Sequence, residues 1–257
     1  GWGAGEGALA GVGGVTRGEG LRRVGRRGGF RGGLPGTRYV TLGGCVAADV
    51  HGKNHHRDGA FSNHVTDLTL ITADGKRLRC SPSRQSQAFW ATVGGMGLTG
   101  IIGEVEMRLR PIETAYLVAE HHPTAHLDET LAYLDDDTFD DEYTVAWIDG
   151  LAQGTALGRG VFMRGHHAAV EDLPGQLRAQ PLAIRGHASH RVPLDVPSGL
   201  LHPAWLRLFN AYYYRRQGAR RAPFVTDYAS FFHPLDALSD WNRLYGTRGF
   251  LQYQCAV

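Results

Sequence analysis

The sequence has little lysine and cysteine and no long apolar run. No uninterrupted apolar segment approaches the ~20 residues that a membrane-spanning helix needs, and the start lacks the apolar core of a signal peptide. The three cysteines, Cys45, Cys80 and Cys255, lie far apart without a CxxC pair, which argues against structural zinc and a disulfide framework. A net charge of +2 gives no indication of a nucleic-acid surface. We therefore expect free thiols, no transmembrane segment, and one large or two modest domains in the 257 residues.

Glycine is abundant, with 36 residues, and it is concentrated in residues 1–33. This segment is Gly/Arg-rich, and its apolar residues follow neither a strand nor a helix period, so it gives no pattern of folded structure. An RNA-binding basic arm and a flexible linker are two interpretations. We favour a third, a shifted reading frame in a GC-rich gene, because the chain has only 2 lysines against 25 arginines.

Patterned sequence begins at Leu34. Pro35 and Gly36 form a turn signal, and residues 39–42 (YVTL) are β-prone. The pattern predicts a strand at 39–42, a tight turn at Gly43-Gly44, and a short helix or extended stretch at 45–48. Adjacent glycines let a flat or phosphorylated ligand approach the backbone closely.

A dense polar cluster follows, in which the histidine spacing matches no standard metal-ligand set and a lysine would repel a cation. Surface histidines without function are one interpretation. We favour a cofactor or substrate loop, in which His51 and Lys53 donate hydrogen bonds to a carbonyl or an anionic ring. The cluster comprises Asp49, His51, Lys53, Asn54, His55 and His56.

Further elements follow along the chain. Residues 65–72 and 76–80 predict a β-hairpin about Asp74-Gly75, and residues 87–91 predict a short helix. The glycine-rich loop at 93–103 fits neither a Rossmann fingerprint nor a P-loop. Alternation at 102–110 predicts a strand that Pro111 ends. Residues 200–221 predict an amphipathic helix with aromatic and basic residues.

These motifs together resemble a known family. They read P-G-T-x-x-V-T-x-G-G, D-V-H-G-K-N-H-H, T-A-D-G and F-W-A-T-V-G-G-x-G-L-T-G-I-I, followed by AWIDG, LGRG, FFHPLDALSDWNRLYG and GFLQYQ. From about Leu34 to Val257 the chain resembles the FAD-linked oxidases of the vanillyl-alcohol oxidase type, which have a PCMH-type FAD domain. Within them it is similar to the actinobacterial branch that acts on decaprenylphosphoryl-β-D-ribose. Residues 1–33 match nothing in this pattern.

The resemblance implies an α+β fold of two parts. Residues 34–110 would be the second part of the FAD-binding domain, and residues 111–257 a C-terminally incomplete substrate domain built on an antiparallel sheet. The family's pyrophosphate-binding loop and its C-terminal segment, which carries an active-site lysine, have no counterpart here. We therefore expect this chain alone to be inactive.

The resemblance also implies site residues. His51 and Lys53 would lie near the flavin ring and polarise it, and the FAD would be non-covalent. Phe232 stands where the family has a tyrosine. From the residues alone, Trp147 is equally a core side chain, and Gln252 and Gln254 share one strand face that solvent could cover. The implied FAD contacts are Gly36, Thr41, Leu42, Gly43, Gly44, Ala48, Asp49, Val50, His51 and Ile102. The implied substrate contacts are Lys53, Trp147, Phe232, Gln252 and Gln254.

The implied function is FAD-dependent oxidation of the 2'-hydroxyl of the lipid-linked ribose to a 2'-keto sugar, for arabinan and cell-wall synthesis. The implied partners are the polyprenyl-phosphate sugar, a quinone acceptor and a short-chain reductase, without nucleic acid or metal. The implied location is the actinobacterial cell envelope, peripheral at the plasma membrane or in the periplasm. Two alternatives stay open: an FAD-dependent sugar or alditol oxidase, and a non-functional truncated product with a basic RNA-binding arm.

Overall fold

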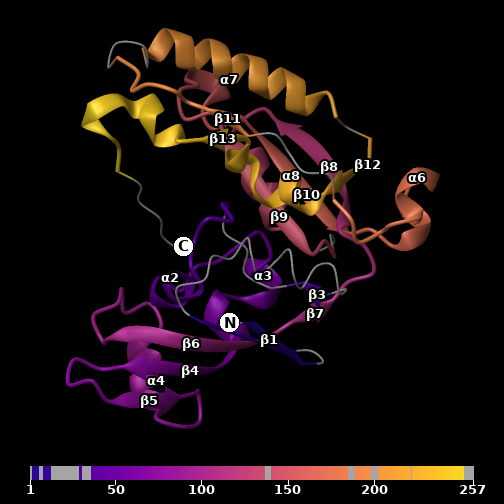
Figure 1. The fold of residues 1–257 in the computed structure, drawn as a ribbon. Helices are drawn as coiled ribbons and strands as arrows, with labels where there is room; N and C mark the ends of the chain where they lie inside the picture. Colours follow the sequence, from indigo (N-terminus) through magenta and orange to yellow (C-terminus); the bar gives the residue numbers. More distant parts are fainter. Residues whose placement is uncertain are drawn as a thin grey trace.

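The computed structural model describes residues 2–5, 8–12, 29–30, 36–136, 140–184, 189–197, 202–220 and 222–251. It has an α+β fold in two lobes, each with its own antiparallel sheet and buried core (Figure 1). The chain passes from the first lobe to the second through the short strand β7 (Arg110–Pro111). The α+β expectation is confirmed, while the domain boundary at residue 110 stays a prediction.

The first lobe is built on a five-stranded sheet in the order β1-β2-β6-β4-β5, and every neighbouring pair is antiparallel. Its strands are β1 (Trp2–Gly5), β2 (Ala8–Val12), β4 (Val65–Ile71), β5 (Arg77–Cys80) and β6 (Ile101–Arg108).

The β4–β5 hairpin forms as the sequence predicts. Val65, Leu68 and Leu70 are buried from β4, and Gly75 adopts a φ of 79° in the turn, which a side chain would oppose. The Thr72 hydroxyl closes the turn by donating to the Asp74 carboxylate at 2.5 Å. The predicted helix at 87–91 is confirmed as α4 (Ser86–Thr92).

The glycine pair at 43–44 lies in a helix rather than in a turn, and residues 39–42 form no strand, so both expectations are wrong. The helix is α2 (Leu42–Ala47), and it buries Leu42, Cys45 and Val46. The spacing of these three residues places them on one helical face, which packs into the first core. Burial of that face outweighs the weak helix propensity of two glycines.

Two further expectations need correction. The strand expected at 102–110 ends at Arg108, and Pro111 lies in β7, where it pairs with Gly29 of β3 (Gly29–Phe30). The segment expected to be unfolded contributes β1, β2 and β3, and β2 pairs along β6 from Ala8↔Arg108. Backbone hydrogen bonds to an existing strand do not require an apolar period, so glycine-rich sequence can add strands.

The second lobe is built on a four-stranded antiparallel sheet in the order β12-β8-β10-β9. The helix α7 runs along the outer side of this lobe (Figure 1). It confirms the helix predicted at 200–221. The main elements are β8 (Tyr116–Thr124), α5 (Leu127–Leu134), β9 (Tyr143–Ile148), β10 (Gly160–His167), α6 (Gly175–Arg178), α7 (Pro203–Gly218), β12 (Phe224–Asp227) and α8 (Tyr228–Phe232).

Smaller elements complete the chain. A parallel pair joins β11 (His190–Arg191) to β13 (Leu238–Ser239). The helix α3 (His55–Asp58) and several 3-10 helices connect the larger elements, at Phe61–His64, Gly154–Ala156, Val170–Asp172, Pro234–Ala237 and Trp241–Arg248. Cys45 and Cys80 are buried cysteines, whereas Cys255 lies outside the described residues.

Candidate active site

The run from Gly36 to α2 is the first part of the site. Thr41 caps α2, because its hydroxyl accepts the Gly44 N–H at 3.0 Å and its carbonyl accepts the Cys45 N–H at 3.0 Å. A Cβ at Gly36 would meet no atom of the described residues within 4 Å, so among these residues one side of this backbone is open. The run therefore offers the exposed main chain that a flat ligand can approach.

The second glycine-rich loop packs against the end of α2. The N–H groups of Gly94 and Met96 donate to the carbonyls of Val46 at 3.0 Å and Ala47 at 2.8 Å. The first lobe therefore brings the two glycine-rich motifs together, although about fifty residues separate them in the chain. Ile102, in β6, packs against the same core at its edge.

Asp49 holds the loop that follows α2. Its φ of 40° is rare for a residue with a side chain, and its carboxylate accepts the Ser62 N–H at 3.0 Å and the Ser62 hydroxyl at 3.1 Å. The Phe61 N–H also donates to the Val50 carbonyl at 2.8 Å. Asp49 thus fixes both ends of the loop that carries the histidines and Lys53.

The histidine-rich loop lies against the second lobe. The Thr144 N–H in β9 donates to the Lys53 carbonyl at 2.8 Å. Asn54 is buried, and its side-chain amide donates to Asp58 at 2.7 Å. The rings of His51 and His55 lie 5.1 Å apart. This loop therefore joins the two lobes at the point where the sequence predicts a cofactor or substrate loop.

Lys53 has an unusual environment. Its Nζ donates to the Phe231 carbonyl at 2.5 Å and lies 4.2 Å from the centre of the Phe231 ring and 6.0 Å from that of Phe232. Burial lowers the pKa of Lys53 to about 8. No carboxylate pairs with this ammonium among the described residues. A lysine with such a pKa can both donate and accept a proton near neutral pH, which is typical of functional sites.

The substrate residues expected in the second lobe have different environments. Trp147, in β9, is half-buried and lies 4.7 Å from the ring of Tyr213 in α7. Phe232 has no exposed surface and packs edge-on against Tyr143 at 4.7 Å. Phe232 is thus a core side chain in this structure. Gln252 and Gln254 lie outside the described residues.

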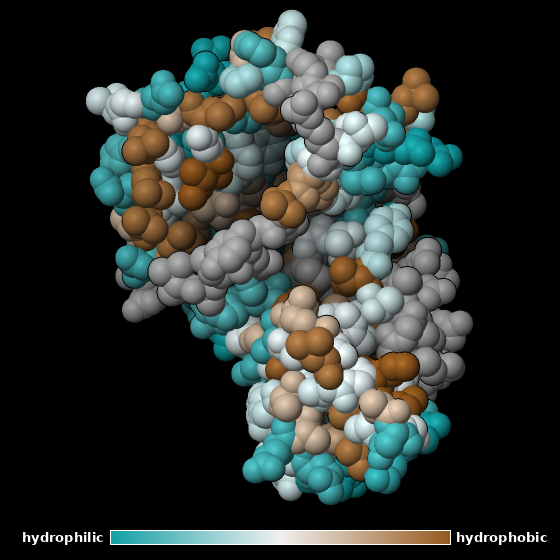
Figure 2. Space-filling view, turned by 90° about the vertical axis from the view of Figure 1, so that its left-hand side faces the viewer, coloured by the Kyte–Doolittle hydropathy of each residue, from teal (hydrophilic) through white to brown (hydrophobic). Residues whose placement is uncertain are grey.

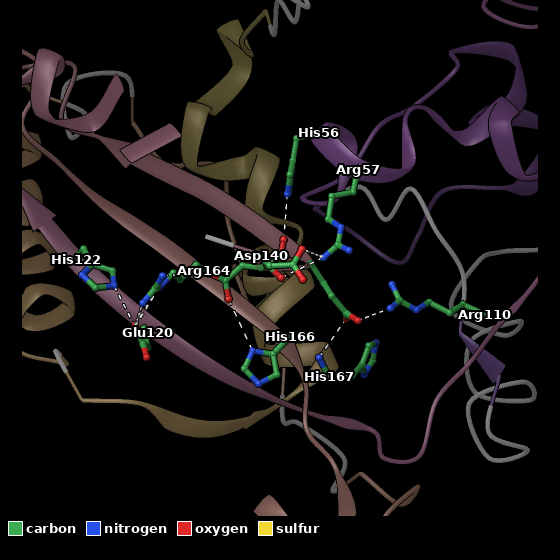
Figure 3. Close-up of polar contacts among 11 residues, drawn as sticks. His56, Arg57, Arg110, Glu120, His122, Asp140, Arg164, His166 and His167 are labelled. Atoms are coloured by element: carbon green, nitrogen blue, oxygen red, sulfur yellow. Dashed lines mark hydrogen bonds and ion pairs between the residues drawn. The ribbon is translucent and has the colours of Figure 1, made fainter. Parts of the chain in front are cut away.

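Ion pairs connect the lobes beside the histidine loop (Figure 3). Arg57 pairs with Asp140 at 3.2 Å, and His56 contacts the Asp141 carbonyl at 3.1 Å. Arg110 pairs with Glu142, whose other oxygen accepts the His167 N–H at 3.2 Å.

The same network continues along the second sheet. The Glu120 carboxylate accepts from Arg164 at 2.6 Å and contacts His122 at 3.2 Å. The hydrogen bond from Arg164 lowers the pKa of Glu120. Arg164 also pairs with Asp141 at 3.3 Å, which extends the network to the lobe boundary.

Residues that sequence reasoning missed also fasten the site. Asp236 binds Thr37 and Arg38 at the start of the open run, and Glu142 binds Arg110. No local signal could reveal the contacts of Asp236, because Thr37 lies 199 positions and Arg38 lies 198 positions away from it in the sequence. In the described part of the chain, no three His, Cys, Asp or Glu side chains are grouped as a metal site would require.

Comparison with protein families identifies the class of domain. Residues 5–81 match the family "FAD binding domain", so this part of the chain is similar to FAD-binding domains. The match confirms the resemblance drawn from the motifs. It also begins inside the segment that was expected to have no counterpart in the family, so that expectation is wrong. The shifted reading frame stays a prediction about the gene.

The chain is also similar to particular proteins. It is 42% identical over 226 residues to decaprenylphosphoryl-β-D-ribose oxidase of Mycolicibacterium smegmatis, covering 87% of this chain and 49% of that protein. It is 36% identical over 232 residues to the protein in the mprA 5' region of Streptomyces coelicolor, covering 87% of this chain and 61% of that protein. Over a shorter stretch it is 29% identical to Δ(24)-sterol reductase of Homo sapiens, covering 38% of this chain and 19% of that protein. The chain thus spans about half the length of the mycobacterial relative.

The residues present fit FAD. The open side of Gly36 leaves room for a ring to approach the backbone, and the adjoining loop places the Lys53 ammonium at the Phe231 carbonyl. Asp49 and the second glycine-rich loop hold the intervening segment in place. FAD is therefore the cofactor that both the family match and the local geometry support.

Proposed function

We propose that the protein oxidises the 2'-hydroxyl of decaprenylphosphoryl-β-D-ribose to the 2'-keto sugar with non-covalent FAD. The observation that carries this proposal is the 42% identity, over 87% of the chain, to an oxidase of that substrate. When bound, FAD would supply the hydride-transfer chemistry. A polyprenyl-phosphate sugar is the substrate class, and a cell-wall precursor pathway is the setting.

The proposed roles of the protein's residues follow from their placement. The expected FAD contacts lie in the Gly36–Val50 run and at Ile102. Lys53 and His51 extend from the next loop as donors to the flavin or the substrate. Lys53 Nζ, with its lowered pKa, can hold the proton that the substrate hydroxyl loses. Trp147, Gln252 and Gln254 would contact the sugar. Phe232 would support these substrate-contacting residues from the core.

The remaining partners are also proposals. A quinone would reoxidise the flavin, and a short-chain reductase would consume the keto sugar. We propose a peripheral location at the plasma membrane or in the periplasm of an actinobacterium. Exposed aromatic side chains beside arginines on α7 support such an attachment, and no helix in the described ranges is long and apolar enough to cross a bilayer.

Two titrations of the purified chain test this function. FAD binding is followed by flavin fluorescence, and binding of detergent-solubilised decaprenylphosphoryl ribose is followed by tryptophan fluorescence, with a free alditol as the comparison. We expect saturable binding of FAD and of the lipid-linked sugar but not of the alditol. Absence of FAD binding would contradict the cofactor assignment, and alditol binding alone would favour the alditol-oxidase alternative.

Two further experiments extend this test. His51→Ala should weaken FAD binding much more than His64→Ala, because His51 lies beside the open run and His64 lies directly before β4. Anaerobic addition of the lipid-linked sugar then tests the expectation that this chain alone is inactive. Bleaching of the bound flavin would show that this expectation is wrong.

A further inference from the structure

The Asp236 carboxylate joins two segments that are distant in sequence. Asp236 lies in the 3-10 helix at Pro234–Ala237 and is only 8% exposed. Its Oδ1 accepts the Thr37 hydroxyl at 2.7 Å, its Oδ2 accepts the Arg38 N–H at 3.0 Å, and Arg38 Nε lies 3.4 Å away. All of these partners belong to the turn that begins the open run at Gly36.

These contacts fix the conformation of that turn. The Thr37 hydroxyl donates to Asp236 and also accepts the Tyr39 N–H at 3.3 Å, so it is oriented on both sides. The backbone then continues to Thr41, which caps α2. One carboxylate therefore sets where the Gly36 backbone lies relative to the start of α2.

The segment that carries Asp236 is held at a second point. The Phe231 carbonyl, five residues earlier, accepts the Lys53 ammonium at 2.5 Å. The start of the expected flavin-binding run and the loop that follows it thus both bind the short stretch 231–236. That stretch also contains Phe232, which is fully buried in the core of the second lobe.

We propose that Asp236 is a positioning residue for the flavin, which fixes the Gly36–Arg38 turn in the conformation that binds FAD and connects it to the Phe231–Phe232 segment. The inference rests on the proposed function only in taking FAD as the ligand of this run. Charge-assisted hydrogen bonds are the stronger ones, and the Arg38 N–H and Nε both face a buried carboxylate. Loss of one such bond predicts about a tenfold weaker affinity for FAD.

The test compares matched variants of the purified chain. Asp236→Asn keeps the size of the side chain but loses its charge, and Thr37→Val removes the hydroxyl donor, whereas Thr37→Ser retains it. Asp240→Asn is the control, because Asp240 pairs with Arg191 at 2.6 Å and makes no contact with the turn. FAD affinity and the absorption spectrum of bound flavin are measured, together with hydrogen exchange of the amides at 36–41 without FAD.

We expect Asp236→Asn and Thr37→Val to bind FAD about tenfold more weakly and to show an altered flavin spectrum and faster exchange in the turn. Thr37→Ser and Asp240→Asn should match the wild type. Wild-type affinity and exchange in Asp236→Asn would overturn the inference, as would equal weakening in Asp240→Asn. If Asp236→Asn does not fold, equal behaviour of Thr37→Val and Thr37→Ser would overturn it.

The two proposals fail separately. A wild-type chain that binds no FAD contradicts the proposed function, while the exchange experiment still tests the positioning of the turn. Unchanged hydrogen exchange of the amides at 36–41 in Asp236→Asn contradicts the positioning role, whether or not the wild-type chain binds FAD.

Discussion

At the scale of single residues, Lys53 gives the most direct test of the site, because the chain has only one other lysine, Lys76. Burial lowers the pKa of Lys53 to about 8, whereas Lys76 is 75% exposed beside Asp74. Trace labelling with acetic anhydride across pH, read by mass spectrometry, should show Lys53 reactivity rising with a midpoint near pH 8. The Lys76 peptide is the internal reference. Reactivity of Lys53 that rises only together with that of Lys76 would contradict the assigned environment.

The lowered pKa of Lys53 has a defined effect on stability. Between the folded pKa of about 8 and the ordinary lysine pKa of 10.5, the unfolded chain binds more protons than the folded chain. The contribution of Lys53 to the free energy of unfolding therefore rises with pH across this window. The destabilisation that comes from burying the charged ammonium is fully present below pH 8. We expect Lys53→Met to remove this rise, as measured by urea unfolding at pH 7 and pH 10.

The buried histidine His121 predicts a change in stability at acidic pH. Burial lowers its pKa to about 4 from the ordinary histidine value of 6.5, so the unfolded chain binds the extra proton between these values. Stability should fall as the pH drops from about 6.5 to about 4, by roughly 3 kcal/mol at most for this group. His121→Gln should reduce this acid sensitivity in urea unfolding, and His190→Gln, at an exposed position, should leave it unchanged. Equal acid sensitivity in His121→Gln would contradict this prediction.

At the scale of elements, α7 combines a firmly attached inner side with an exposed apolar side. Its outer side chains Trp205, Leu208, Phe209 and Tyr212 are between 57% and 64% exposed. Apolar groups are also visible on the upper lobe in Figure 2. No residue of α7 is buried, so polar contacts are important for holding it.

Asp149 is the main polar anchor of α7. This residue is 2% exposed, and it accepts hydrogen bonds from Arg159 at 2.9 and 3.1 Å and from Asn210 of α7 at 2.7 Å. Burial acts to raise the pKa of Asp149, but the hydrogen bonds from Arg159, Asn210 and the Leu151 N–H together lower it.

Removing this anchor should destabilise the chain. Asp149→Ala leaves Arg159 without its partner and should cost about 3 kcal/mol of unfolding free energy, whereas Asn210→Ala should cost about 1 kcal/mol. Asn210→Ala should also speed hydrogen exchange in α7 while the amides of β8 and β10 stay protected. The control is Asn242→Ala at an exposed position. Equal exchange of α7 in Asn210→Ala and Asn242→Ala would argue against the anchor.

At the scale of the whole molecule, the ion pairs at the lobe boundary differ in expected strength. The Asp140 side chain is 94% exposed, so its pair with Arg57 should contribute less than about 1 kcal/mol. Glu142 is 15% exposed and binds both Arg110 and the His167 N–H, so Glu142→Ala should cost about 2 kcal/mol. Urea unfolding of the two alanine variants measures the difference. A larger loss for Asp140→Ala would contradict this ranking.

The sequence predicted the elements whose signals are local. Alternation and the Asp74-Gly75 turn indicated the β4–β5 hairpin, and helical patterning indicated α4 and α7. The helix α2 was missed because Gly43-Gly44 is a turn signal, whereas the buried face of the helix decides the structure. The strands in residues 1–33 were missed because β2 and β3 pair with β6 and β7, which lie far along the chain. The contacts of Asp236 lacked any local signal for the same reason.

The pairing of β2 with β6 also bears on how the chain acquires its fold. Arg108, the partner of Ala8, is made only after a further hundred residues. Until then, β1 and β2 have exposed edges with no native neighbour in their sheet, apart from each other. Such long-range pairing slows folding and exposes an intermediate to aggregation.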